Sequence, residues 1–303
     1  MIKQILYFGS PAKISTELKQ IVIERKNNEG NFEKITRPIE DIGVVVLDHP
    51  QISITHLCIA QLIQNNVVII SCNQNYMPNG IMLPIEGHDT QSERMRSQIE
   101  ASEPLKKNLW QQTIIAKIKN QAAVLEYFQK DAGVMYGYAK EVKSGDADNK
   151  ESTAANYYWR HLFSEHPNFS RHPKGPWPNA VLNYGYAILR SVTARALVAS
   201  GLFPSFGIFH RNRYNAFALA DDIMEPYRPY VDIIAKHIYQ KYPEEQELTK
   251  EIKAELLKIP HIDTTIENEK SPLMIALQRT SSSLVKCFMG QQRKLIYPEI
   301  KFK

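Results

Sequence analysis

The sequence predicts an α+β protein in which a small β-rich N-terminal domain is followed by a larger all-α domain. Two observations carry this prediction. In residues 1–84 the apolar residues alternate or form short β-branched runs, whereas beyond about residue 90 they recur at helical spacing. With 303 residues and a hydrophobic fraction of 43%, the chain can form packed cores and is not disordered as a whole. We therefore expect two domains, residues 1–84 and 85–303.

The N-terminal domain is expected to contain short strands and one short helix. An alternating run and two β-branched runs indicate strands: QIVIER (20–25), IGVVVLD (42–48) and NVVIIS (66–71). Residues 53–65 have helical spacing between two of these runs. Residues 26–34 (KNNEGNFEK) are typical of a turn joining two strands, and Pro78, Asn79 and Gly80 predict a turn before one more strand.

The C-terminal domain is expected to be helical. Residues 92–130 predict one or two helices with a break near Pro104. Residues 178–201 predict a strong helix, because Pro178 and Gly201 stand at the positions expected for its two ends. Two further helical patterns follow: 244–258, on the surface, and 271–290.

Charge and cysteine content limit the class of protein. The net charge is +5 and lies beyond the neutral residues 1–84, which permits a polyanionic partner without requiring one. The three cysteines, Cys58, Cys72 and Cys287, form no CxxC pair, which argues against a disulfide framework and a cysteine zinc site and fits a reducing cytoplasm. We expect neither a signal peptide in MIKQILYFGS nor a membrane span.

The polar run GDADNKE leads into a helical pattern whose first turn contains Glu151. A carboxylate there complements the helix dipole, which is worth about 0.3–1 kcal/mol. However, Ala155, Tyr158 and Leu162 follow at helical spacing, so Glu151 lines up with an apolar, inward face. An inward carboxylate must be paired, protonated or bound to a metal.

Residues 207–232 (GIFHRNRYNAFALADDIMEPYRPYVD) concentrate ligand-type side chains. Asp221 and Glu225 are four positions apart and Asp222 and Glu225 three, so either pair shares a helix face. Like charges at that spacing repel unless a cation lies between them. Arg228 can neutralise one of them, which would be a purely structural arrangement.

Pro226 and Pro229 predict a kink or a helix restart beside these carboxylates. His210 follows the apolar run FPSFGIF and is either a core or cap residue or a ligand. One histidine and two carboxylates form a mostly oxygen set, which suits Mg²⁺ or Mn²⁺ better than a structural zinc. Such a site can activate an attacking oxygen and stabilise the charge on a phosphodiester.

A competing cluster lies at residues 161–172 (HLFSEHPNFSRH), with His161, Glu165, His166 and His172. It lacks the HExxH spacing, so we interpret it as a loop with surface histidines. The motifs GxGxxG, GxxxxGK[ST] and GxSxG are absent from the sequence, which leaves nucleotide-fold and nucleophile-elbow interpretations without support.

Three segments follow one another along the chain: KESTAANYYW (150–159), VLNYGYAILRSVTARALVASGL (181–202) and the run at 207–232. Together they resemble the CRISPR-associated integrase, the universal adaptation endonuclease that inserts new spacers. The resemblance extends to SPAKISTELKQIVIE (10–24) and is most specific in residues 151–232. It is greatest to the version found beside type II CRISPR effectors. It implies a β-sandwich-like N-terminal domain for dimerisation and partner contact, and a helical catalytic, DNA-binding domain.

The resemblance implies a metal triad that matches Glu151, His210 and Glu225 and binds Mg²⁺ or Mn²⁺. Many family members carry aspartate at the last position, and glutamate within MEPYRP fits the type II-like pattern. Asp222 matches a further carboxylate near the metal, and Asn183 a motif residue that supports the site. The resemblance leaves His210 as either a ligand or a proton carrier.

The implied reaction is two transesterifications, in which the 3′-hydroxyls of a foreign DNA fragment attack the CRISPR repeat at each end. The implied partners are double-stranded and branched DNA, a second copy of the chain, and a dimer of a second, smaller adaptation protein that bridges two dimers. The type II effector machinery is a further candidate partner.

Seven basic residues of the motif region are candidates for phosphate contact: Arg160, Lys174, Arg190, Arg195, Arg211, Arg213 and Arg228. For Arg190 and Arg195 the alternative is a solvated helix face. The tail QQRKLIYPEIKFK (291–303) is either a disordered basic end or a partner-binding strand.

Two other functions stay open. One is a stand-alone metal-dependent nuclease acting on branched DNA in repair, and the other a non-catalytic DNA-holding subunit whose acids are merely salt-bridged. Metal dependence separates the integrase from the holding subunit, and strand joining separates it from the nuclease.

Overall fold

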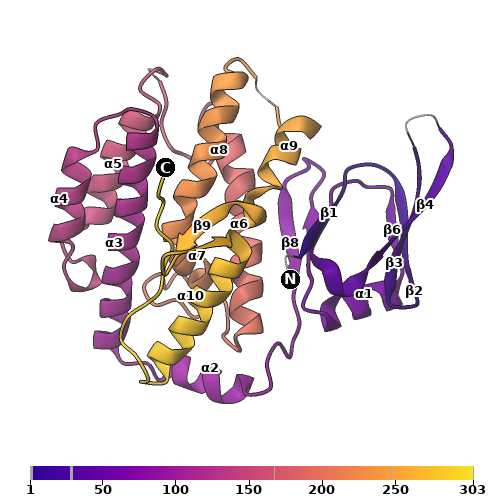
Figure 1. Ribbon diagram of the computed structural model, residues 1–303, viewed down its shortest axis with the longest axis horizontal. Coiled ribbons are helices and arrows are strands. Elements are labelled where there is room, and N and C mark those ends of the chain that lie inside the picture. The colour runs from indigo at the N-terminus through magenta and orange to yellow at the C-terminus, as the bar shows by residue number, and fades with distance from the viewer. Residues whose placement is uncertain (1–2, 28–29, 167, 246, 303) are drawn as a thin grey trace. The chain divides into compact units, whose positions relative to one another are not determined.

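A computed structural model describes residues 3–27, 30–166, 168–245 and 247–302 (Figure 1). The chain divides into two compact units, Met1–Gly87 and His88–Lys303. The first unit consists of strands with one helix, and the second is mainly helical. The predicted α+β fold class is therefore confirmed.

The N-terminal unit has two four-stranded sheets. One has the order β1-β5-β7-β8 and the other β4-β3-β2-β6. Their strands are β1 (Gln4–Phe8), β2 (Ala12–Glu17), β3 (Gln20–Lys26), β4 (Phe32–Pro38), β5 (Ile42–Leu47), β6 (Ile52–Ile54), β7 (Val68–Cys72) and β8 (Pro78–Met82). Helix α1 (His56–Gln64) begins at Thr55, whose side chain accepts a hydrogen bond from the Cys58 amide, and packs against β2 and β7.

The core of this unit explains the strand patterns. Ile21 and Ile23, at period two in β3, are buried in it, as are β5 residues and Leu62 of α1. The predicted turn at Pro78 is wrong, because β8 begins at that residue and pairs antiparallel with β7. The chain reverses earlier, where Asn73 accepts from the amides of residues 75 and 77. The turn predicted at 26–34 includes residues 28 and 29, which lie outside the described residues.

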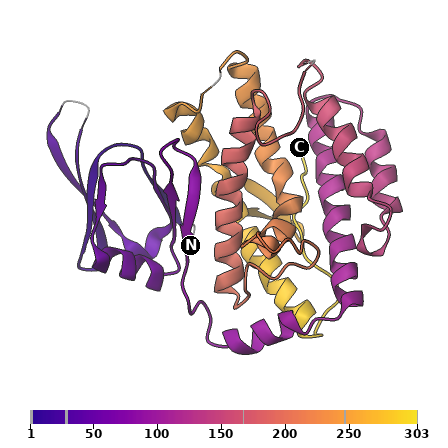
Figure 2. The same cartoon turned by 180° about the vertical axis from the view of Figure 1, so that it is seen from behind.

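Helices build the C-terminal unit (Figure 2). They are α2 (Gln91–Ile99), α3 (Glu103–Tyr127), α4 (Gly133–Glu141), α5 (Lys150–Leu162), α6 (Asn179–Ala199), α7 (Ala218–Met224), α8 (Arg228–Lys241), α9 (Lys250–Leu256) and α10 (Leu273–Phe288). The break predicted near Pro104 separates α2 from α3, and Pro104 itself lies in the first turn of α3. Among the described residues, no helix is long and apolar enough to cross a membrane.

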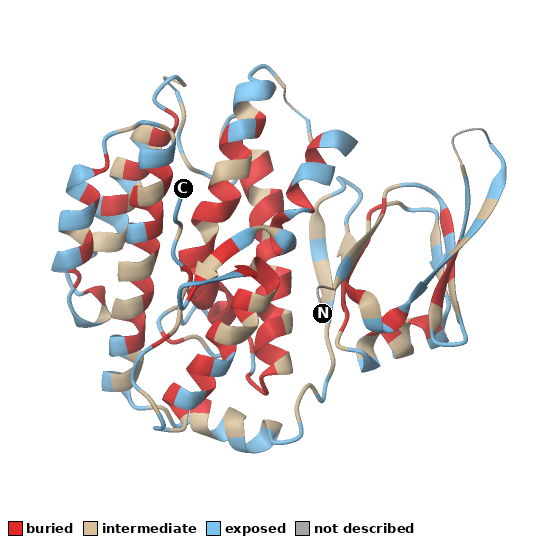
Figure 3. Cartoon of the chain, in the orientation of Figure 1, coloured by how far each residue is buried: buried red, intermediate tan, exposed pale blue. Residues whose placement is uncertain are grey.

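Two long helices organise this unit. Helix α6 packs against α7, α8, α9 and α10, and α3 packs against α4, α5, α8 and the 3₁₀ turn η3 (Glu225–Tyr227). Gly185 lets α6 approach α8 closely, because a Cβ there would lie 2.5 Å from Cγ1 of Val231. Figure 3 shows that buried residues run along the inward faces of α6, α8 and α10.

Two features of this unit differ from the prediction. The helix expected at 244–258 is shorter, because Thr249 caps it and α9 begins at Lys250. A two-stranded antiparallel hairpin, β9 (Asp263–Ile266) with β10 (Glu269–Pro272), was not predicted. Its strands are only four residues long, too short for a period-two pattern to stand out.

A buried carboxylate ties three helices together. Asp232 of α8 is 1% exposed and accepts hydrogen bonds from the hydroxyls of Tyr158 (2.9 Å) on α5 and Tyr186 (2.5 Å) on α6. Burial raises the pKa of Asp232 from 3.8 to about 6, although the two tyrosine hydrogen bonds oppose the rise.

Asp232→Asn should change how stability depends on pH. The folded chain binds the Asp232 proton more tightly than the unfolded chain, so the free energy of unfolding falls as pH rises from about 4 to about 6. The gap between the two pKa values corresponds to about 3 kcal/mol. Urea unfolding at pH 4 and pH 6.5 should show this fall in the free energy of unfolding in the wild type. The variant should lack the contribution of Asp232. Equal pH dependence in both proteins would contradict the assignment.

Candidate metal centre

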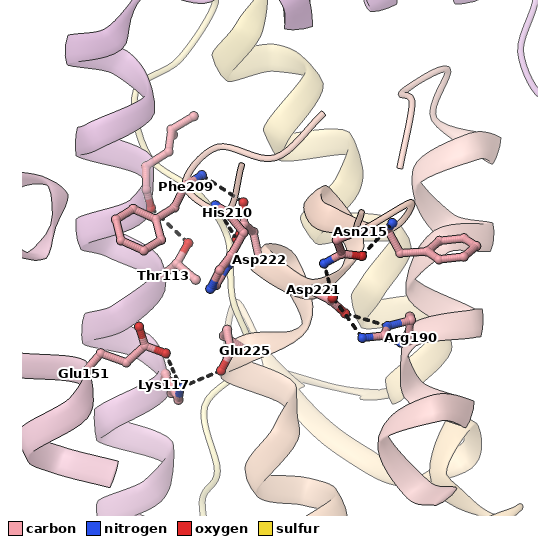
Figure 4. Close-up of polar contacts among 12 residues, drawn as sticks. Thr113, Lys117, Glu151, Arg190, Phe209, His210, Asn215, Asp221, Asp222 and Glu225 are labelled. Carbon is pink, nitrogen blue, oxygen red and sulfur yellow. Dashed lines mark hydrogen bonds and ion pairs between the residues drawn. The ribbon is translucent and has the colours of Figure 1, made fainter. Parts of the chain in front are cut away.

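The segment 207–232 is not one helix. Residues 207–217 form a loop, α7 runs from 218 to 224, and the chain passes through the 3₁₀ turn η3 before α8 begins at Arg228. The predicted kink at Pro226 and Pro229 is therefore confirmed, with Glu225 at the first position of the turn. This break turns Glu225 toward α3 and α5, as Figure 4 shows.

Besides Asp232, the segment has three acidic residues, and each contacts a different part of the structure. Asp221 forms a bidentate ion pair with Arg190 of α6, at 2.6 and 2.9 Å, and accepts from Asn215 at 2.8 Å. Asp222 is completely buried and faces the loop that contains His210. Only Glu225 faces the candidate ligand Glu151 (Figure 4).

Glu151 and Glu225 converge on one buried ammonium group. Nζ of Lys117, on α3, lies 2.6 Å from Oε1 of Glu151 and 2.6 Å from Oε2 of Glu225. Arg228 Nε lies 2.9 Å from the other oxygen of Glu225. Arg228 thus neutralises one of the carboxylates, as the sequence suggested, and that carboxylate is Glu225.

The start of α5 aims Glu151 at this point. Asp146 accepts from the amides of Lys150 (2.8 Å) and Glu151 (3.0 Å), and Asn149 caps the helix through the Ser152 amide. These side chains satisfy the first amides of the helix. The carboxylate of Glu151 is therefore left to face α3, on the same side as the buried residues of α5.

The cluster is charge-balanced inside the protein. Burial favours neutral Glu225, but the charges of Arg228 and Lys117 outweigh it and lower the pKa of Glu225. Burial likewise opposes the charged form of Lys117, and Glu225 and Glu151 outweigh it and raise the Lys117 pKa. Glu225, Lys117 and Arg228 are therefore ionised at neutral pH.

His210 is held by Asp222 beside the cluster. Its Nδ1 donates to Oδ1 of Asp222 at 2.5 Å, and the amides of Phe209 and His210 also donate to this carboxylate. Gly207 permits this close approach of the loop to Asp222, because a Cβ at residue 207 would lie 2.5 Å from the His210 carbonyl oxygen and 2.7 Å from Oδ2 of Asp222. With Nδ1 engaged, Nε2 is the nitrogen left for a ligand or a proton.

The hydrogen bond to Asp222 is the main reason that the pKa of His210 is raised. Burial opposes the rise, and the charges of Asp222, Glu225 and Glu151 add to it. For Asp222, burial is the largest influence on the pKa and raises it, although His210 stabilises the charged carboxylate. The imidazole is thus within electrostatic reach of both glutamates.

The residues fit a divalent cation. Lys117 Nζ is a cation that already lies between the two candidate oxygen ligands. Oε2 of Glu225 is buried and is paired with the Lys117 ammonium at 2.6 Å. Glu151 and Glu225 would hold a divalent cation through their carboxylate oxygens, and that cation would supply the positive charge that Lys117 supplies here. Within the described residues no three His, Cys, Asp or Glu side chains yet form a ligand cluster.

The other candidate site residues differ in their contacts and exposure. Asn183 of α6 accepts from Arg171 and donates to the Pro173 carbonyl, so its bonds fix the loop before α6. Arg190 and Arg228 are bound to carboxylates, and Arg195 is half-buried. The exposed basic candidates are Arg160, Lys174, Arg211 and Arg213.

The competing histidine cluster has other contacts, and its interpretation as a loop is wrong for His161, which lies in the last turn of α5. Glu165 pairs with Lys236, and His161 Nδ1 lies 2.8 Å from the Tyr157 carbonyl oxygen. No metal-ligand group is found there among the residues described.

The sequence interpretation missed Lys117. It also missed Gln98, which is 1% exposed and bonds the Phe203 amide and the carbonyls of Phe203 and Phe206, thereby fixing the loop before His210. The sequence did contain a signal for Lys117, because its spacing places it on the same helix face as Trp110, Ile114 and Gln121. A lysine on an apolar helix stripe requires an anionic partner.

Known structures share this fold. A casposase bound to its integration product superposes with a TM-score of 0.79 at 19% identity, over 97% of this chain and 92% of that one. A Cas6-RT-Cas1–Cas2 complex gives a TM-score of 0.73 at 20% identity, over 99% of this chain and 36% of the longer chain. These two likenesses show that the fold of this chain is shared with a casposase and with a Cas1-containing chain.

Sequence comparison identifies the family. A CRISPR-associated endonuclease Cas1 from Neisseria meningitidis serogroup C (strain 8013) is 36% identical over 280 residues, 92% of this chain and 90% of the relative. The family described as CRISPR associated protein Cas1 matches residues 6–267. The chain belongs to the Cas1 family, which confirms the resemblance found in its motifs.

Asp222→Asn should lower the pKa of His210, because it removes the ionised acceptor at Nδ1. Protonated His210 stabilises the wild-type fold below pH 6.5, and this contribution is lost as pH rises through the raised folded pKa. NMR titration of the metal-free proteins measures the change, with the other histidine signals as internal controls. An unchanged His210 titration would show that Asp222 does not set its charge.

Proposed function

We propose that this protein is a metal-dependent DNA endonuclease and integrase of CRISPR adaptation, which joins 3′-hydroxyl ends of foreign DNA to the CRISPR repeat by transesterification. The observation that carries the proposal is the convergence of Glu151 and Glu225 on one buried cation beside the His210–Asp222 pair, in a member of the Cas1 family. The relative from Neisseria bears the name of an endonuclease, and the casposase structure holds an integration product.

The side chains divide the chemistry among them. Glu151 and Glu225 supply oxygen ligands, and Arg228 keeps Glu225 ionised and oriented. Asp222 orients His210 so that Nε2 either binds the metal or takes the proton of the attacking hydroxyl. When bound, Mg²⁺ or Mn²⁺ would lower the pKa of that hydroxyl and neutralise charge on the phosphate.

The reaction exchanges one phosphodiester for another. The attacking 3′-oxygen loses its proton and bonds to phosphorus. The bond between phosphorus and the 3′-oxygen of the repeat breaks, and that oxygen takes up a proton. With water as the attacking group, the same site cuts DNA.

The exposed basic side chains are the best candidates for phosphate contact. Arg211 and Arg213 lie in the loop after His210, and Arg160 lies on α5, the helix that contains Glu151. Contacts of this kind position DNA without reading its bases. Arg190 and Arg228 neutralise carboxylates inside the unit, so we assign them to the site's framework.

We further propose that the protein acts as a homodimer with Cas2 as the smaller partner. A structural relative is described as a complex that includes Cas2, at 20% identity. The N-terminal unit is the proposed surface for both contacts, and the type II effector machinery remains a candidate for supplying DNA fragments.

A non-catalytic DNA-holding subunit is the second candidate. One observation favours it, since both glutamates are already ion-paired with Lys117 or Arg228. Metal dependence decides between the two functions.

Strand transfer on a branched DNA that mimics the half-integrated product tests the proposal. With Mg²⁺ or Mn²⁺ the wild type should reseal the branch, and a chelator should abolish the reaction. Glu151→Gln, His210→Ala and Glu225→Gln should each lose about 10²-fold or more in rate, because each removes a ligand or a proton carrier. DNA binding, followed by fluorescence anisotropy, should survive in all three.

Either of two outcomes would contradict the integrase. A wild type that binds the branch but neither cuts nor joins it with either metal is a holding subunit. A wild type that only cuts is a nuclease.

Lys117→Gln should destabilise the metal-free protein by about 3–5 kcal/mol, because it leaves Glu151 and Glu225 facing each other without their shared cation. Added Mn²⁺ should restore more stability to the variant than to the wild type. Thermal unfolding with chelator and with Mn²⁺ measures this difference. Lys119→Gln, at an exposed position of the same helix, is the control and should change little.

A further inference from the structure

The C-terminal segment 293–300, here called the strap, lies along α3, α10 and β9. Gln112 of α3 bonds the carbonyl of Arg293 and the amide of Leu295, and Thr265 of β9 accepts from the Glu299 amide at 2.8 Å. Thr113 of α3 bonds the hydroxyl of Tyr297 at 2.8 Å. The strap is thus a docked part of the helical unit, and of the two alternatives for the tail, the disordered basic end is wrong for these residues.

A first chain of hydrogen bonds leads from the strap to the residue after Glu225. Asn120 of α3 is 3% exposed, and its Nδ2 donates to the carbonyl of Pro298 at 3.0 Å and to the carbonyl of Pro226 at 2.8 Å. Its Oδ1 accepts from the Ile300 amide at 3.0 Å. One buried amide therefore joins the strap to the turn η3.

A second, independent chain reaches the same turn from α10. The hydroxyl of Thr280 donates to the Ile296 carbonyl at 2.6 Å and lies 2.6 Å from the hydroxyl of Tyr227. Thr280 and Tyr227 are both completely buried. Pro226 and Tyr227, the two residues that follow Glu225, are thus both tied to the strap, through different helices.

The turn needs such support because of its composition. Pro226 and Pro229 lack amide hydrogens, so the helix is interrupted where Glu225 has to face Glu151. Two amide donors are therefore missing at the turn and at the start of α8, and contacts from outside the helix help to fix the orientation of the turn. Partners that orient a ligand in this way commonly alter metal affinity 10–100-fold when they are removed.

We propose that the strap positions the proposed metal ligand Glu225, and that Asn120 and Thr280 are the positioning residues that connect the two. This inference rests on the proposed function. It predicts that cutting either connection weakens metal binding without weakening DNA binding.

The test compares Mn²⁺ binding by calorimetry in the full-length wild type, Asn120→Ala and Thr280→Val, at a temperature where circular dichroism shows all three folded. Each variant should bind Mn²⁺ about tenfold more weakly, and the double variant weaker still. Strand transfer should fall at limiting Mn²⁺ and recover at high Mn²⁺. Binding of branched DNA should be unchanged.

Gln111→Ala is the matched control. It removes one amide-to-carbonyl bond from α3, to Val142 at 2.7 Å, away from the strap. It should lower stability as the other variants do and leave the Mn²⁺ affinity unchanged.

Two results would overturn the proposal. Asn120→Ala and Thr280→Val with a lowered unfolding midpoint but a Mn²⁺ affinity within twofold of wild type would make the strap a stabilising element only. A wild type that binds no Mn²⁺ and joins no DNA would refute the proposed function, and the positioning role with it.

Discussion

The ion triad of Lys117 with Glu151 and Glu225 is the contact on which the site depends. Two ionised carboxylates repel each other strongly in a low-dielectric interior, and a cation between them removes most of that cost. Here a lysine of α3 supplies that cation, and Arg228 balances the second charge of the cluster. The triad thereby fixes α5 and the turn η3 against α3 and brings together Glu151 and Glu225, the two carboxylates of the proposed metal site.

Helix α3 organises the rest of the unit for the same reason. Three of its buried polar side chains, Thr113, Lys117 and Asn120, follow one another along the helix and contact the strap, the two glutamates and the turn η3 in succession. Each is a polar group placed in an apolar interior, so each must be bonded. Satisfying them forces the C-terminal segment, α5 and η3 to meet at this helix.

Adjacent acids acquire different roles because successive helix positions point about 100° apart. Asp221 therefore binds Arg190 of α6, while Asp222 turns to the loop and holds His210. Gly207 and Gln98 shape that loop by close approach and by hydrogen bonding. The result is a histidine fixed on one nitrogen, beside carboxylates whose charges are maintained by buried cations.

The sequence by itself determined the two-domain α+β plan, most helices, the kink at Pro226 and the candidates Glu151, His210 and Glu225, because periodicity, prolines and motif order are local properties of the chain. It did not determine the β9–β10 hairpin or the start of β8, where the strands are short and turn residues such as Asn79 lie inside the ladder.

The tertiary structure alone decided that Lys117 joins the two glutamates, that Asp222 rather than Asp221 holds His210, and that Asn120 ties the C-terminal segment to the turn. These contacts join residues up to 180 positions apart. Such pairs are chosen by packing and by the cost of an unpaired buried charge or amide, and local sequence patterns do not encode them.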